Sequence, residues 1–108
     1  MRNFLIEVEV LFGKKVYLSK EIFVEICRKH PEIITQFEKM KEVLRSPQMV
    51  RRSKYDPKVL LFYKLFKDTP VSEKYLMVAV LTSNSEGYVI TSYFTDRVKM
   101  GEEIWREG

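Results

Sequence analysis

The stretch VLLFYKLF at residues 59–66 decides the fold class, because its odd-numbered and even-numbered positions are both apolar, except at Lys64. A second run, YLMVAVL at residues 75–81, has the same character. Such runs are typical of interior strands, since both faces of the strand are covered. A hairpin loop at 83–87 and a further strand at 88–95 follow. These neighbouring strands predict a sheet that is mainly antiparallel.

The residues before this sheet predict a strand or hairpin and two helices. Residues 4–12 alternate as a half-buried strand, and a turn at 13–14 leads into a second strand at 15–18. Ser19 is placed to cap a first helix, and a second helix is expected from Pro31 to about residue 45.

Residues 48–53 are a candidate short strand, and a last turn or short helix is expected from Asp96 to near Trp105. The predicted fold is therefore α+β, with an N-terminal strand or hairpin and two helices packed on a sheet of four or so strands.

Length and composition exclude several classes of protein. The 108 residues, 45% of them hydrophobic, suit one domain over residues 1–108. No apolar run approaches the ~20 residues that span a bilayer, so no membrane contact is expected. Cys27 and His30 are the only cysteine and histidine, and no phosphate-loop or nucleophile-elbow motif occurs, so no metal or cofactor is expected. A charge at Glu7 argues against a signal peptide and for a cytoplasmic location.

Positive charge is concentrated in the middle of the chain. Seven Lys and Arg residues lie between residues 45 and 67, against the single acid Asp56, although the whole chain carries only +4. Such a cluster attracts phosphates, and Tyr55, Phe62 and Tyr63 in the same stretch can stack on nucleobases if they are exposed. The alternative is a solvated surface above a core that holds these aromatic rings.

Two further features carry possible chemistry. On the strand at 88–95, one parity holds Val89, Thr91, Tyr93 and Thr95, and a row of hydroxyls can bind a phosphate or position an acid. His30 can accept and release a proton near neutral pH. The alternatives are a half-exposed strand, which collects Thr and Tyr, and a histidine that merely ends a helix.

The order of short motifs resembles a known family. The motifs are LSKE at 18–21, HPEI at 30–33, VLRSP at 43–47, VRRS at 50–53, VITSY at 89–93 and KMGE at 99–102. Together they resemble the phage and prokaryotic nuclease-like domains of the barnase/EndoU/colicin/RelE superfamily. The resemblance implies helices against an antiparallel sheet and RNA cleavage without metal, in phage or toxin–antitoxin contexts. Related sequences often carry a histidine one turn before the His-Pro pair, where this chain has Glu25.

The leading hypothesis is therefore a small endoribonuclease that cleaves RNA by attack of the ribose 2′-hydroxyl. Its candidate catalytic residues are His30, Glu25, Arg51 and Tyr93. Its candidate substrate-binding residues are Arg52, Ser53, Tyr63, Thr91 and Thr95. The expected partners are RNA, either single-stranded or structured, and an antitoxin protein, and the choice between monomer and homodimer stays open.

Two other classes of function remain. One is a nucleic-acid-binding module without catalysis, suggested by Glu25 at the histidine-like position. The other is a protein-interaction or assembly subunit of a mobile element, in which the strand at 4–12 pairs with another chain and Trp105 anchors the contact.

Overall fold

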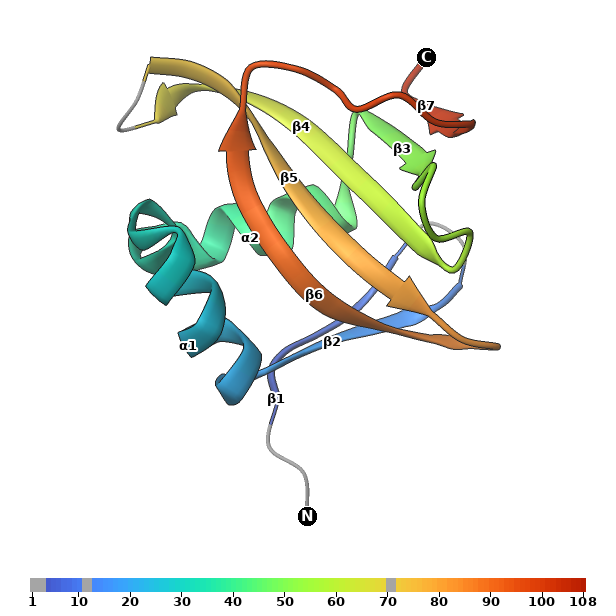
Figure 1. Cartoon of the computed structure of the whole chain (residues 1–108), viewed down its shortest axis with the longest axis horizontal. Helices are drawn as coiled ribbons and strands as arrows, with labels where there is room; N and C mark the ends of the chain where they lie inside the picture. The colour runs from blue at the N-terminus through green and yellow to red at the C-terminus, as the bar shows by residue number, and fades with distance from the viewer. Residues whose placement is uncertain (1–3, 11–12, 70–71) are drawn as a thin grey trace.

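The helices lie against one face of a continuous β-sheet (Figure 1). The structure is a computed structural model, and it describes residues 4–10, 13–69 and 72–108. In this part of the chain the strands are β1 (Phe4–Glu9), β2 (Lys15–Ser19), β3 (Met49–Arg52), β4 (Val59–Thr69), β5 (Ser72–Thr82), β6 (Glu86–Thr95) and β7 (Glu103–Arg106). The helices are α1 (Lys20–Lys29), the 3₁₀ turn η1 (Pro31–Thr35) and α2 (Phe37–Arg45).

The α+β class is confirmed, but the expected sheet of four or so strands is too small. Over the described residues the sheet has seven strands in the order β1-β2-β6-β5-β4-β3-β7. The N-terminal hairpin joins this sheet because β2 pairs in parallel with β6, Tyr17 lying opposite Tyr88. The segment expected to form a last turn or short helix instead forms β7, which pairs with β3 and places Trp105 opposite Val50.

The helical region also differs in detail from the expectation. Ser19 caps α1 as predicted, its hydroxyl accepting a hydrogen bond from the Ile22 backbone N–H at 3.2 Å. The predicted second helix is divided at Gln36 into η1 and α2. His30 ends α1 in a non-helical conformation (φ −133°, ψ 78°), because the following Pro31 disfavours a helical residue before it. Residues 11–12, the end of the first predicted strand, lie outside the described residues.

Two apolar clusters lie on opposite faces of the sheet. The larger one packs the sheet against the helices and includes Ile26, Leu44 and Phe62. The smaller one lies on the other face and is made by Met49, Val59, Leu61, Tyr63, Met77 and Ala79. Val98, in the segment from β6 to β7, packs against this second cluster. Figure 1 shows that segment passing from the end of β6 towards β3, where β7 begins.

No helix among the described residues is both long enough and apolar enough to cross a membrane.

Candidate functional site

The sheet face that points away from the helices, called the open face below, carries residues of both the basic strand and the hydroxyl-bearing strand. Residues directly opposite each other in an antiparallel ladder share a face. One row across β3, β4, β5 and β6 is Arg51, Leu61, Ala79 and Thr91. The next row is Met49, Tyr63, Met77 and Tyr93. Arg51, Thr91 and Tyr93 therefore lie on the same face of the sheet, with β4 and β5 between the arginine and the two hydroxyl-bearing residues.

A bulge in β6 changes the predicted parity of this strand. The register between β5 and β6 shifts after Ala79, so that Val89 lies opposite Val80 on the helix side. Thr91, Tyr93 and Thr95 stay on the open face without Val89. The Thr95 hydroxyl already donates to the Arg97 carbonyl at 3.1 Å and accepts from the Arg97 N–H at 3.2 Å. Of the predicted hydroxyl row, Thr91 and Tyr93 therefore define the candidate site.

Tyr63 anchors the loop that carries Lys99. The Tyr63 side chain is completely buried, so it cannot stack on a base as the sequence suggested. Its hydroxyl oxygen accepts a hydrogen bond from the Lys99 backbone N–H at 3.0 Å. Burial raises the pKa of Tyr63, so that the hydroxyl remains protonated at neutral pH. Tyr63 is therefore a positioning residue for Lys99.

Lys99 lies over Tyr93 on the open face. Its ammonium nitrogen is 5.5 Å from the centroid of the Tyr93 ring, a cation–π contact. A hydrogen bond with the Tyr93 side chain raises the pKa of Lys99, against a smaller opposite effect of burial. Lys99 therefore carries a positive charge at neutral pH.

His30 also contacts the Tyr93 ring. Its ring centroid is 5.1 Å from that of Tyr93, with an angle of 36° between the planes. The His30 Nδ1 atom is 3.9 Å from Glu32 Oε1, and about one third of the side chain is exposed. The end of α1 and the strand β6 thus bring together His30 and Tyr93, which are distant in the sequence.

Arg51 has one shared carboxylate partner. Its Nη2 atom is 3.8 Å from Glu103 Oε1, whereas Arg106 Nη2 is 2.7 Å from the same oxygen. Arg51 also donates to the Met49 sulfur at 3.1 Å and to the Gly101 carbonyl at 3.4 Å. Two guanidiniums therefore share the Glu103 carboxylate, and this end of the open face keeps an excess of positive charge.

Arg52 and Glu25, two predicted site residues, are not brought to the open face. Arg52 lies opposite Leu60, and its guanidinium is bound by Glu102 at 3.1 Å and by the Pro57 carbonyl at 2.7 Å. Glu25 lies on α1, where Arg28 donates to its carboxylate at 2.6 Å. This hydrogen bond lowers the pKa of Glu25, which makes the carboxylate a weaker base.

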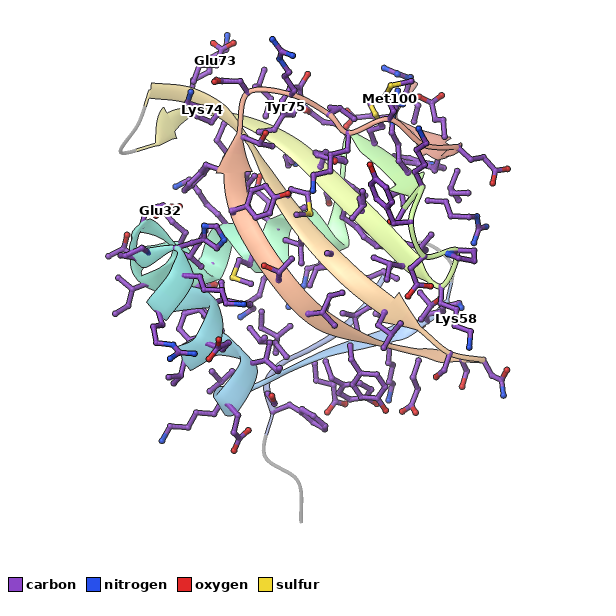
Figure 2. All side chains as sticks on the ribbon, viewed as in Figure 1. Glu32, Lys58, Glu73, Lys74, Tyr75 and Met100 are labelled. Atoms are coloured by element: carbon purple, nitrogen blue, oxygen red, sulfur yellow. The ribbon has the colours of Figure 1, made fainter. Side chains whose placement is uncertain are left out.

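A cavity of about 410 Å³, called the Tyr55 cavity below, opens beside Lys99. Its lining residues are Ser53, Lys54, Tyr55, Leu61, Lys99 and Met100. Ser53 is the predicted site residue among them, and the Ser53 hydroxyl oxygen accepts a hydrogen bond from the Tyr55 N–H at 3.2 Å. Sequence reasoning missed Lys99 and Met100, because only the fold returns their loop to β3 and β4. Figure 2 shows Met100 on this loop.

Comparisons with protein-family models, with curated proteins and with solved structures give no match for this chain. Within residues 4–10, 13–69 and 72–108, no three or more His, Cys, Asp or Glu side chains are grouped so as to hold a metal ion.

Proposed function

We propose that the protein is an endoribonuclease that binds single-stranded RNA on its open face and cleaves it without a metal ion. The observation that carries this proposal is the meeting of His30, Tyr93 and Lys99 in one contact network. Arg51 lies on the same face, on β3, with β4 and β5 between it and Tyr93. A proton acceptor, a hydroxyl and two cations are the groups that metal-independent phosphodiester cleavage requires.

Lys99 and Arg51 supply the binding energy for the sugar–phosphate backbone. Both are cations on the open face, and the Glu103 carboxylate near Arg51 is bound more closely by Arg106. Cations on a strand-binding face displace the counterions of the nucleic acid, which makes affinity depend strongly on salt. Tyr93 provides a hydroxyl in contact with Lys99, and Thr91 provides a second hydroxyl on the same face of β6.

The same groups account for the chemical step. His30 takes the proton of a ribose 2′-hydroxyl, and the 2′-oxygen attacks the adjacent phosphorus. The bond from phosphorus to the 5′-oxygen breaks, and Tyr93 gives its proton to that oxygen. Lys99 stabilises the negative charge on the phosphate and on the Tyr93 oxygen. The products are a 2′,3′-cyclic phosphate and a 5′-hydroxyl end.

The test is cleavage of a 5′-labelled single-stranded RNA by the purified protein in EDTA, with the new ends identified by mass spectrometry. We expect 2′,3′-cyclic phosphate ends, and a loss of about 10²-fold or more in rate for His30→Asn and for Tyr93→Phe. Tyr88→Phe is the matched control, because Tyr88 lies on the same strand but stacks on Tyr17. The proposal fails if the wild type does not cleave, or if both site variants cleave at its rate.

A second candidate is RNA binding without catalysis. It is favoured by Glu25, which stands where the resemblance of the motifs implies a histidine and which Arg28 and Lys29 hold in ion pairs. In that case affinity falls with salt by a slope of about 0.7 per phosphate contacted, and no product forms. An affinity that does not change between low and moderate salt would exclude this candidate.

A further inference from the structure

The Tyr55 cavity has apolar surface that the fold leaves uncovered. Tyr55 is 90% exposed and Met100 is 78% exposed, although both are large and apolar. Both line the same cavity, with the buried Leu61 between the loops that carry them. Lys54 and Lys99 add two positive charges to the lining. A flat apolar group attached to an anion matches this combination of surface and charge.

The side of the cavity formed by residues 53–58 is held in place by local hydrogen bonds. The Ser53 N–H donates to the Val59 carbonyl at 2.8 Å, and the Tyr55 N–H donates to the Ser53 hydroxyl at 3.2 Å. The Lys58 N–H donates to Asp56 Oδ1 at 3.0 Å. Tyr55 therefore projects from a turn whose backbone is already ordered.

The side formed by Lys99 and Met100 is fixed as well. Tyr63 binds the Lys99 backbone N–H, and a Cβ atom on Gly101 would lie 2.2 Å from the Arg52 carbonyl oxygen. The loop can approach β3 this closely only because residue 101 is glycine. Because the backbone is fixed on both sides, an incoming ring has to order only the exposed side chains of Tyr55 and Met100.

Lys99 belongs both to this cavity and to the contact network of Tyr93 and His30. A group seated in the cavity is therefore adjacent to the phosphate that Lys99 binds in the proposed function. In RNA, the group one ribose away from a phosphate is a nucleobase. Stacking on exposed aromatic side chains is the usual way in which proteins hold an unpaired base.

We infer that the Tyr55 cavity is a subsite for one unpaired nucleobase of the RNA, stacked on Tyr55 and covered by Met100. The inference rests on the proposed function and adds to it a binding site for one base of the single-stranded RNA. The base must be out of a helix, so the protein selects single-stranded RNA over duplex RNA.

The test measures binding rather than cleavage. The probe is a short oligoribonucleotide with 2′-O-methyl riboses, which cannot attack the phosphate, and with one 2-aminopurine whose fluorescence is quenched by stacking. A second oligonucleotide lacks that base. We expect quenching on binding, and an affinity at least about 5-fold lower for the oligonucleotide without the base. Tyr55→Ala lowers affinity for the complete probe by a similar factor, whereas Tyr55→Phe, which keeps the ring, does not.

The decisive comparison is a double-mutant cycle. If Tyr55 stacks on the base, Tyr55→Ala binds the two oligonucleotides equally. If Tyr55→Ala keeps the affinity of the wild type while Arg51→Met weakens binding, the open face binds only the RNA backbone, and the base subsite is refuted while the proposed RNA binding stands. If the wild type binds neither oligonucleotide, the proposed function fails and the subsite fails with it.

Discussion

Arg51 and Arg52 are neighbours in the sequence but project from opposite faces of β3. Arg51 lies opposite Leu61 of the open-face cluster, and Arg52 lies opposite Leu60 of the cluster that packs against the helices. Strand geometry requires this alternation. A pair of arginines that looks in the sequence like one phosphate clamp is therefore two separate groups with different partners.

The two arginines consequently form a matched pair of variants. Arg51→Met is expected to weaken RNA binding and to reduce the slope of log affinity against log salt by about 0.7. Arg52→Met removes an ion pair with Glu102 and a hydrogen bond to the Pro57 carbonyl, so its effect is on stability, at about 1–2 kcal/mol. Fluorescence anisotropy over a salt series measures both. Equal losses of affinity in the two variants would contradict this assignment.

Tyr63 is expected to act through Lys99 rather than on RNA itself. Tyr63→Phe leaves the ring in the core but removes the acceptor of the Lys99 N–H, which costs about 1 kcal/mol of stability. Faster hydrogen exchange at the Lys99 amide is the specific readout. The rate of cleavage falls because Lys99 loses its fixed position. If exchange at Lys99 does not change, Tyr63 does not anchor this loop.

Glu25 is expected to affect stability in a pH-dependent way. A carboxyl whose pKa is lower in the folded than in the unfolded protein stabilises the fold above its unfolded pKa, and this contribution is lost as the pH falls through the folded pKa. Glu25 is such a carboxyl, because its hydrogen bond with Arg28 lowers its pKa in the folded protein. Glu25→Gln should therefore lower the urea midpoint at neutral pH and leave it unchanged at about pH 2.

The same variant separates Glu25 from the catalytic groups. Because its carboxylate is paired along α1, Glu25→Gln should cleave RNA at the wild-type rate. A loss as large as that expected for His30→Asn would show that Glu25 acts as the base after all.

Gly101→Ala is expected to displace the loop that carries Lys99 and Met100. The new methyl group would meet the Arg52 carbonyl at 2.2 Å, so the backbone must move, at a cost of about 1–3 kcal/mol. Affinity for RNA should fall as well. Gly13→Ala is the control: Gly13 has a φ of 72° but open space around its Cβ position, so the alanine strains the turn without touching the site. Urea unfolding measures the loss of stability in both variants, and fluorescence anisotropy measures the loss of RNA affinity, which is expected for Gly101→Ala alone.

Local signals in the sequence predict the elements well, and pairings between distant segments account for what they miss. The cap at Ser19 could be predicted because its hydroxyl accepts a hydrogen bond from a residue only three positions away. The parallel contact of Tyr17 with Tyr88 depends on two segments far apart in the chain, so the hairpin was not expected to extend the sheet. Short β7 exists because it pairs with β3, and its own four residues carry no strong strand signal.

The same limit applies to the candidate site: local patterns could be read from the sequence, and contacts between distant segments could not. Strand periodicity places Thr91 and Tyr93 on one face of their own strand, but the position of Arg51 on the same face depends on the pairing of four strands. The bulge that moves Val89 to the helix side leaves no local signature. Lys99 could not be found, because its position depends on a hydrogen bond to the buried Tyr63.

The most direct test of RNA binding at the open face is a map of amide chemical shifts by NMR during titration with a 2′-O-methyl single-stranded oligonucleotide. We predict that the largest changes fall on Arg51, Thr91, Tyr93 and the loop around Lys99, with little change on α2. Changes concentrated on the helices, or no changes at saturating oligonucleotide, would contradict the account.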